Sequence, residues 1–392
     1  MASAAEAVRP PIWRDVRFLR VLGQVAFVVA VVVVGRELYL NLAFGMRSIG
    51  QNLSFDFLQF RAGFPIKEGI SYSPNQPYTR AFIVGLVNTL RVAGIGIVLA
   101  TLLGLLMGVA RLSPNWLVRK TAQVYVEVFR NTPVLIQIIF LYFAVVLTLP
   151  AIEGGFSIGG VAFLSNQGTA IPWPRAQEGA GIWALFVFAG VAAAWGVRQW
   201  RKKINERTGQ PARRFLWSSG TLLAFAVVGY FVSGTPVRMD VPEVTGLIYS
   251  GGFRLSPEYT AILLALVIYT GAFIAEIVRG SILAVDRGQK EAGAALGLTP
   301  FQQLRHVVLP QAMRIAIPPI NSQFLNLTKN SSLAVAVAYP ELSAVSSTMI
   351  NQAGRAFQIT IMVMATYLAL SLTISLFMNI LNRAVAYRGV RR

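Results

Sequence analysis

The sequence predicts an all-α membrane protein of about eight transmembrane helices, and two observations lead to this fold class. The 392 residues are 55% hydrophobic and only 13% charged, whereas soluble chains carry about twice that charged fraction. The apolar residues also gather in continuous runs, near the ~20 residues that a helix needs to cross a bilayer. A membrane β-barrel would instead need ~10-residue segments of alternating polarity.

The eight expected spans can be justified in order along the chain. The first follows an arginine-rich leader and ends at "GRELYL" without a small-residue cleavage site, so we expect it to be retained and not removed as a signal peptide. The second and third are joined by a short basic turn, and the fourth and fifth flank the basic stretch "RQWRKKINERTGQPARR". The apolar runs place the spans at residues 19–40, 82–110, 128–149, 181–198, 215–233, 258–284, 314–340 and 358–381.

The spans divide the chain into parts of different character. Residues 1–80 hold the first span and a long external segment, in which "SFDFLQFRAGF" alternates polar and aromatic residues, as expected for a piece in the membrane interface. Residues 81–385 form the main membrane domain, which is interrupted at 150–257 by an insertion with two extra spans. Residues 386–392 form a basic tail. No internal repeat is apparent, which disfavours a transporter built from paired inverted repeats.

The net charge of +19 lies mostly on one side of this predicted topology. With the N-terminus in the cytoplasm and the sides alternating, cytoplasmic segments hold 24 of the 35 lysines and arginines, and the opposite loops hold seven. This asymmetry follows the positive-inside rule, and the excess suits the anionic inner leaflet. Both termini are therefore expected in the cytoplasm, and nucleic-acid binding is not needed to explain the charge.

The polar segment "GQKEAGAALGLTPFQQLRHVVLPQ", residues 288–311, lies between two apolar runs and carries the signals of two short helices. The first helix is expected from Asp286 to Leu296 and should stop at Gly297, because glycine adopts the left-handed conformation without steric cost. A second helix is expected to begin with a capping box and to be closed by Pro310. The residues that form this capping signal are Thr299, Pro300 and Gln302.

The first of these helices carries a face of small residues, Ala292 to Ala295, which would let another backbone approach closely. Glu291 adds a carboxylate near the helix start, where the helix dipole or a partner arginine can hold it. The alternative is a cytoplasmic loop that merely lies on the membrane. The regular capping signals favour a docking element instead.

"EAGAALGLTPFQQLRHVVLP" resembles the EAA loop of bacterial ABC-importer permeases, in which Glu-Ala-Ala, a glycine and a final Leu-Pro recur at fixed spacing. "FRNTPVLIQ", "YTGAFIAEIVRGSI", "LPQAMRIAIPPINSQFLNLTKNSSL" and "GLVNTLRVA" are similar to permeases for polar amino acids, the histidine/glutamine/glutamate group. The extra first span and the inserted pair are most like the long Q-type subunit of general L-amino acid importers. The loop residues in register with the motif are Glu291, Ala292, Gly297, Leu309 and Pro310, with Gly293 in place of the second alanine and Val307 in place of isoleucine.

The resemblance implies a type I ABC importer permease core, in the bacterial inner membrane, with a cytoplasmic coupling helix that docks on an ATPase. It also implies four partners: a second homologous permease subunit, a cytoplasmic ATPase dimer, a periplasmic amino-acid-binding protein and the lipid bilayer. ATP and Mg²⁺ would be bound by the ATPase, so no cofactor is expected in this chain. The residues assigned to ATPase coupling are Glu291, Ala292, Gly293, Gly297, Leu309 and Pro310.

Polar side chains within the expected spans are candidates for a substrate path, because charges at membrane depth usually face protein or water. Glu276 can pair with Arg279 three residues later, or it can take part in substrate passage. The second group follows two prolines, Pro318 and Pro319, which should break the helix. It can meet a zwitterionic substrate or hydrogen-bond between helices, and it consists of Lys329, Asn330, Ser331 and Ser332.

Two further details bear on the substrate path. Relatives often have Lys-Asp-Thr-Ser-Leu where this chain has "KNSSL", which makes the substrate less easy to infer. Asn88 and Arg91, three residues apart in the second span, can hold helices together or line the path, and we favour the first role.

Several chemistries are not expected in this chain. It has no cysteine, and its one histidine, His306, is expected on the cytoplasmic surface, so neither thiol chemistry nor a metal site is predicted. No Gly-Lys pair is present, so a nucleotide-binding P-loop is ruled out and the chain is not expected to be an enzyme. Besides the permease, two functions remain open: a secondary amino acid transporter driven by an ion gradient, and a membrane scaffold without transport.

Overall fold

The computed structural model describes residue 13 and residues 16–48, 50, 54–209, 213–246 and 248–385. Among these residues, six single helices are long and apolar enough to cross a membrane, or up to eight spans when each of two bent pairs counts as one. The expected number of about eight is therefore confirmed. The single helices are α1 (Val16–Ser48), α2 (Tyr78–Ala110), α5 (Ala180–Thr208), α6 (Arg214–Val232), α7 (Pro257–Leu283) and α12 (Ala356–Val385).

The span expected at 128–149 is one of the bent pairs. Helix α3 (Trp116–Asn131) and the run formed by α4 (Val134–Phe140) and a π-turn (Leu141–Val146) meet at 104°. The corner lies at Thr132 and Pro133, whose backbones are extended, because a proline disfavours the helical conformation of the residue before it. The start of the expected span therefore belongs to the preceding helix.

The second bent pair corrects two expected helix breaks. The run from α9 (Pro300–Gln303) passes through a π-turn (Leu304–Val308) into α10 (Leu309–Asn330), so neither Pro310 nor the pair Pro318–Pro319 ends the helix. In a regular α-helix, the ring of Pro310 would clash with the carbonyl of His306, four residues earlier. His306 lies in the π-turn, whose wider winding avoids this clash.

The bend of this second pair comes later in the chain. The run continues as a 3-10 segment, η6 (Ser331–Val337), and Ala338 then takes a left-handed conformation with φ of 58°. Helix α11 (Leu342–Ala353) follows at 55° to the run.

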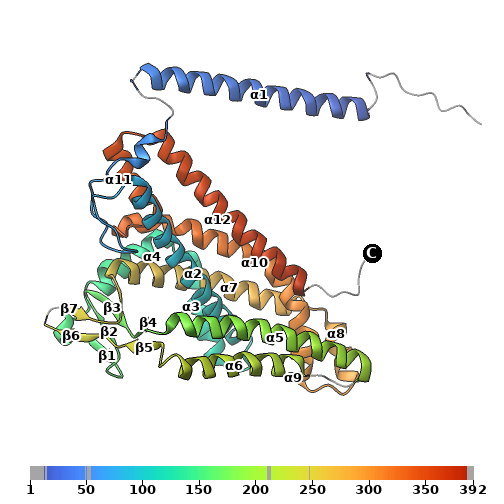
Figure 1. The fold of residues 1–392 in the computed structure, drawn as a ribbon. Coiled ribbons are helices and arrows are strands. Elements are labelled where there is room, and N and C mark those ends of the chain that lie inside the picture. Colours follow the sequence, from blue (N-terminus) through green and yellow to red (C-terminus); the bar gives the residue numbers. More distant parts are fainter. Residues whose placement is uncertain are drawn as a thin grey trace, which may run out of the picture.

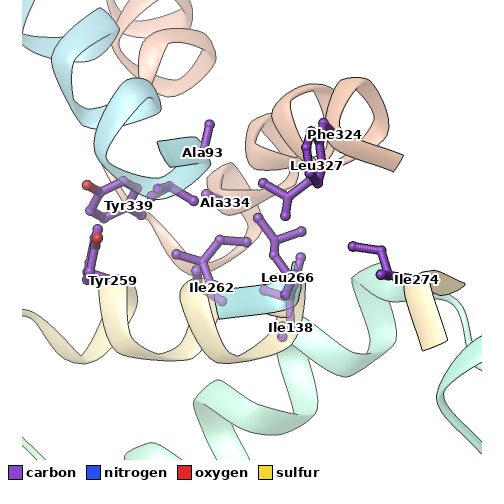
Figure 2. Packing of buried hydrophobic residues seen from close by; sticks show 14 of the residues in the cluster. Ala93, Ile138, Tyr259, Ile262, Leu266, Ile274, Phe324, Leu327, Ala334 and Tyr339 are labelled. Carbon is purple, nitrogen blue, oxygen red and sulfur yellow. The ribbon is translucent and has the colours of Figure 1, made fainter. Parts of the chain in front are cut away.

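Helices α2 and α7 form the centre of the bundle, and η6 and the end of α10 pack on them. Figure 2 shows Ile262 and Leu266 of α7 facing Leu327 of α10 and Ala334 of η6 within one buried cluster. Many other apolar side chains of the helices are exposed in the isolated chain, as expected of a surface that faces lipid.

Two glycines of α2 allow its backbone to approach α7 closely. A Cβ atom on Gly104 would lie 2.5 Å from Ile274 Cγ2, and one on Gly108 would lie 2.8 Å from the carbonyl oxygen of Ala275. These glycines are four residues apart, the small-xxx-small spacing of close helix pairs in membranes. This pattern was not predicted from the sequence.

The insertion contains short strands as well as the two expected helices. Four strands form an antiparallel sheet in the order β1-β2-β3-β8, and two further pairs are β4–β5 and β6–β7. Helices α5 and α6 pack against each other as a hairpin that extends away from the strands (Figure 1). The strands are β1 (Phe156–Ile158), β2 (Ala162–Ser165), β3 (Gly168–Ile171), β4 (Trp173–Ala176), β5 (Val237–Asp240), β6 (Glu243–Thr245), β7 (Ile248–Ser250) and β8 (Phe253–Leu255).

The bundle has two distinct ends, as Figure 1 shows. The strands lie at the start of α7, and we call this the sheet end. Helices α8 (Arg287–Ala295) and α9 follow the other end of α7. We call residues 286–308, which contain these two helices, the elbow, and this end of the bundle the elbow end. The basic tail predicted at 386–392 lies outside the described residues.

The segment before α2 folds back onto the bundle instead of lying only in the membrane interface. A 3-10 turn, η2 (Asp56–Gln59), and a backbone bridge between Arg61 and Pro77 turn the chain toward α2. Phe57 and Phe64 are buried in a cluster with residues of α2 and α11. The aromatic residues at these two positions therefore serve protein packing, which corrects the interface expectation for them.

Candidate functional site

The first helix of the elbow (residues 286–308), α8, begins and ends as its sequence predicts. The Asp286 carboxylate accepts a hydrogen bond from the N–H of Gly288 and so caps α8. Gly297 is left-handed, with φ of 74°, and its N–H donates to the carbonyl of Ala294. The N–H of Leu298 then donates to the carbonyl of Gly293, at 3.1 Å, which completes a Schellman motif.

The second helix of the elbow begins with the expected capping box. The N–H of Thr299 donates to Gln302 Oε1 at 2.8 Å, and the N–H of Gln302 donates to Thr299 Oγ1 at 3.3 Å. Gln303 Nε2 also donates to the carbonyl of Leu298, at 3.0 Å, across the turn. Every backbone turn of the elbow is thus fixed by hydrogen bonds, so the elbow can move as a rigid unit.

Gly293 serves packing inside the elbow and not its outer face. It is buried, and a Cβ atom on it would lie 3.3 Å from Gln303 Cγ. The neighbouring Ala292, Ala294 and Ala295 are exposed. Only part of the predicted small-residue face is therefore open to a partner.

The outer surface of the elbow carries large apolar side chains in addition to the alanines. Leu296 is 81% exposed and Phe301 67% exposed. Glu291 is exposed as well. Leu309 and Pro310 lie at the start of α10 and not on this surface. These two side chains and the exposed alanines give the elbow an apolar outer surface.

The elbow is joined to two helices of the bundle. Val285, Val308 and Ala312 form a buried cluster to which Ile282 of α7 adds. Gln311 Nε2 also contacts Gln289 Oε1 at 3.4 Å. A force applied to the elbow is therefore transmitted to α7 and α10 together, because packed side chains do not deform continuously.

Glu276 lies in a group of arginines near the elbow end of α7. Its carboxylate pairs with Arg279 at 3.2 Å, as one of the two sequence readings expects, and also with Arg111 and, at 3.8 Å, with Arg130. These arginines belong to the ends of α2 and α3 as well as to α7. The carboxylate thus joins three helices as a structural ion pair network.

The other expected path residues lie far from Glu276. Leu327 and Leu266 belong to the same buried cluster, and Leu266 lies ten residues before Glu276 on α7, about 15 Å along the helix, so Lys329 is separated from Glu276 by about this distance. Ser331 Oγ donates to the carbonyl of Thr328, and Ser332 Oγ to that of Lys329. One amino acid cannot touch both groups at that distance, and the two serines bond to their own helix. Lys329 is exposed and Asn330 half-buried.

A cavity of about 1010 Å³ opens at the sheet end instead. Its wall combines the segment before α2, one residue of α2, β8 with the start of α7, and the turn after η6. The charged residues of the wall are Lys67, Glu68, Arg91, Arg254 and Glu258. No sequence pattern marks this cavity, because its parts lie as far apart as residues 65 and 340.

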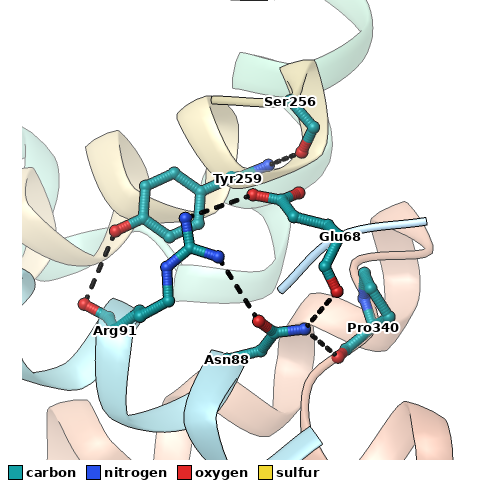
Figure 3. Close-up of polar contacts among 6 residues, drawn as sticks. All are labelled: Glu68, Asn88, Arg91, Ser256, Tyr259 and Pro340. Carbon is teal, nitrogen blue, oxygen red and sulfur yellow. Dashed lines mark hydrogen bonds and ion pairs between the residues drawn. The ribbon is translucent and has the colours of Figure 1, made fainter. Parts of the chain in front are cut away.

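Figure 3 shows how Asn88 holds the cavity wall together. Asn88 Nδ2 donates to the carbonyl of Glu68 at 3.1 Å and to that of Pro340 at 2.8 Å. Gly69 is required at this contact, because a Cβ atom there would lie 2.7 Å from Asn88 Oδ1. The role predicted for Asn88, holding segments together, agrees with these contacts.

Arg91 and Glu68 face each other across the same wall (Figure 3). The guanidinium lies over the rings of Phe253 and Tyr259, at 5.0 and 5.4 Å from their centres, and 3.8 Å from a Glu68 oxygen. Burial raises the pKa of the Glu68 carboxyl above its ordinary value, and nearby Ser256 and Arg91 lower it by less. Arg91 therefore lines a cavity, which is the role that the sequence analysis did not favour.

Sequence analysis also missed Glu341, which is fully buried. Its carboxylate caps α11 by accepting from the N–H of Ala344 at 2.9 Å, and it accepts from the hydroxyls of Tyr367 at 3.0 Å and Thr89 at 3.3 Å. An acidic residue directly before an apolar helical run was the one available signal.

Residues 100–388 match the family model described as binding-protein-dependent transport system inner membrane component. The chain is 41% identical to the general L-amino acid transport system permease protein AapQ of Rhizobium johnstonii, over 98% of this chain and 95% of that protein.

Two further proteins are similar over most of the chain. The glutamate/glutamine/aspartate/asparagine transport system permease protein BztB of Rhodobacter capsulatus is 38% identical, over 95% of this chain and 94% of that protein. Among solved structures, an amino acid ABC transporter with histidines is 20% identical, with a TM-score of 0.47, over 78% of this chain and 95% of that one.

Proposed function

The chain belongs to the family of inner membrane components of binding-protein-dependent transport systems, and from this premise we propose that it is the permease subunit of an ATP-driven importer for polar and general L-amino acids. The relatives whose names carry a substrate are permeases for L-amino acids or for glutamate, glutamine, aspartate and asparagine. Both relatives are matched nearly from end to end, so the proposal applies to the whole chain.

The elbow is the single observation that carries this proposal furthest. A secondary transporter or a membrane scaffold has no use for a rigid, capped pair of helices with exposed leucine and phenylalanine. An importer needs such a surface, because ATP is hydrolysed on another protein and the resulting movement must reach the spans. The residues proposed for this coupling are Glu291, Ala292, Gly297, Leu296 and Phe301, with Gly293 packed inside the elbow and Leu309 and Pro310 at the start of α10, where the elbow joins the bundle.

The mechanism follows from what the elbow is attached to. When the two ATPase subunits close, the elbow moves with the surface on which it is docked. Its buried contacts with Ile282 of α7 and Ala312 of α10 then move those helices together. Helix α7 also reaches the cavity at the sheet end, so closure at one end changes access at the other.

The proposed assembly contains this chain, a second homologous permease, two ATPase subunits that bind ATP and Mg²⁺, and a periplasmic amino-acid-binding protein. The elbow is single within the described chain, and two ATPase subunits need two such surfaces. A second permease subunit supplies the other one.

The proposed function is tested by purification and transport. The tagged chain, produced with its neighbouring gene products, is expected to co-purify with an ATPase and, in vesicles with the binding protein, to import labelled glutamine only when ATP is inside. Import driven by an ion gradient without ATP would contradict the proposal and favour a secondary transporter. Neither import nor an associated ATPase would favour a scaffold.

The proposed orientation places the elbow and both termini in the cytoplasm and the sheets outside. Because the chain lacks cysteine, single cysteines can be labelled without background. Glu206, near the end of α5, and Thr245, in β6, are both exposed. An impermeant thiol reagent with access to the periplasm should label Thr245→Cys and leave Glu206→Cys unlabelled. The opposite labelling pattern would reverse the topology.

A further inference from the structure

The cavity at the sheet end is built by segments outside the central helix pair as much as by that pair. Lys67, Glu68 and Ile70 come from the segment before α2, and Phe253 and Arg254 come from β8 of the insertion. Strand β8 runs directly into Ser256, which caps α7 by accepting from the N–H of Tyr259 at 3.0 Å. The segment before α2 and the insertion thus bring charged side chains to the sheet end of the bundle.

The position of Glu68 disfavours the ionised form of its carboxylate, because the side chain is buried. Both of its carboxylate oxygens are buried, and hydrogen bonding by Ser256 and the charge of Arg91 offset the cost of that burial only in part. Arg91 is the nearest cation, but its 3.8 Å separation is longer than a hydrogen bond. A buried carboxylate whose charge is only partly compensated costs stability, and such groups are enriched at functional sites.

Arg91 is held in position by groups other than Glu68. Two aromatic rings, those of Phe253 and Tyr259, flank its guanidinium, and Asn88 Oδ1 accepts one hydrogen bond at 3.5 Å. The side chain keeps 21% of its surface exposed, on a residue that lines the cavity. A guanidinium held in place at the wall of a cavity is well suited to bind a carboxylate ligand.

We propose that this cavity binds the zwitterion of a free amino acid, with its ammonium at Glu68 and its carboxylate at Arg91. The two protein charges lie as close to each other as the two charges of an α-amino acid, so one ligand backbone can satisfy both. Glu258, whose Oε1 accepts from Tyr142 at 3.1 Å, adds a second carboxylate on the ammonium side.

The size of the cavity determines how selective this site is. A volume of about 1010 Å³ exceeds what one amino acid fills. The ligand side chain would lie toward Ile66 and Leu255 or toward Lys67 and Arg254, so apolar and acidic side chains both find partners. The site therefore recognises the ammonium and carboxylate groups that all amino acids share, and it accepts many different side chains. This inference rests on the proposed function. It identifies the sheet end as the place where the imported amino acid first contacts the permease.

The test measures binding directly, on the purified transporter complex without its binding protein. Labelled L-glutamine is expected to bind saturably, and N-acetylglutamine and glutamine amide, which lack the ammonium and the carboxylate charge, are expected to compete poorly. Glu68→Gln and Arg91→Gln should each weaken glutamine binding by about tenfold or more, the loss of one charge-assisted contact. Glu243→Gln and Arg238→Gln, which remove the same charges from exposed strand positions outside the cavity, should leave it unchanged.

A second measurement separates a ligand contact from a structural one. Because burial raises the pKa of Glu68, its ionised form opposes folding at neutral pH, and Glu68→Gln should keep or raise the temperature of thermal unfolding. Weaker binding without loss of thermal stability supports the site. Absence of saturable binding to the unmodified complex, unchanged binding in both variants, or weaker binding only together with a lower unfolding temperature would each overturn it. ATP-driven import by the same complex shows independently whether the proposed function holds.

Discussion

Replacement of Gly108 by leucine is expected to prevent stable folding of the bundle. Gly108 lies where α2 crosses α7, and a Cβ atom there would be 2.8 Å from both the carbonyl oxygen of Ala275 and Val278 Cβ. The clash involves the Cβ itself and a backbone atom, so no side-chain rotation relieves it. The two central helices must separate, at a cost of about 3 kcal/mol or more, a large part of a stability of about 5–15 kcal/mol.

Separation of α2 from α7 would also disrupt the packing of the neighbouring helices. The buried cluster that includes Ile262, Leu266 and Ile274 is held between the same two helices and α10. Gly108→Leu should therefore yield protein that aggregates on size-exclusion chromatography in mild detergent and shows no cooperative thermal unfolding.

The matched control lies on the same helix. Gly94 of α2 is exposed, and a Cβ atom there would have no neighbour within 4 Å. Gly94→Leu makes the same chemical change and is expected to leave the elution profile and the unfolding temperature nearly unchanged. Equal behaviour of the two variants would mean that close packing of α2 on α7 is not what holds the bundle together.

The double replacement of Leu296 and Phe301 by serine is expected to abolish import while the protein folds normally. Both side chains are exposed on the elbow, so the isolated chain loses little packing. If they are buried against the ATPase, their loss removes about 3 kcal/mol of apolar contact, which weakens association more than about a hundredfold. Leu296 and Phe301 take part in the caps of α8 and α9 only through their backbones, and the capping side chains are those of Asp286, Thr299 and Gln302, so the helix ends remain intact.

Two measurements check this expectation on the same preparation. The amount of ATPase that co-purifies should fall, and ATP-driven glutamine import should fall with it, while the unfolding temperature of the permease is unchanged. Phe215→Ser, which removes an equally exposed phenylalanine at the start of α6, is the control and should retain both. Full import by the double variant would show that the elbow does not dock through these side chains.

The elbow illustrates what can be predicted from local sequence. Its capping box and the left-handed stop at Gly297 were predicted correctly, because both depend on residues within four positions of each other. The continuity of α10 through Pro310 was not predicted. The π-turn that accommodates the proline is a feature of the folded helix, and no single residue type marks it.

Glu276 and Glu68 show where prediction from sequence reaches its limit. The pairing of Glu276 with Arg279 follows from helical spacing, but its pairing with Arg111 and Arg130 requires that three helix ends meet. Glu68 lies in a segment that carries no motif. It becomes a candidate ligand group only because Asn88 and Gly69 hold that segment against α2.

The sequence by itself determined the membrane class, the approximate spans, the family and the two capped helices of the elbow. These features depend on composition, on runs of apolar residues and on short spacings, which act within a few residues along the chain. The tertiary structure alone distinguished Gly108 from Gly94 on one helix and brought Glu68 to Arg91 at the mouth of the bundle. Such contacts join residues far apart in the chain, and their energy depends on distances that are fixed only when the helices pack.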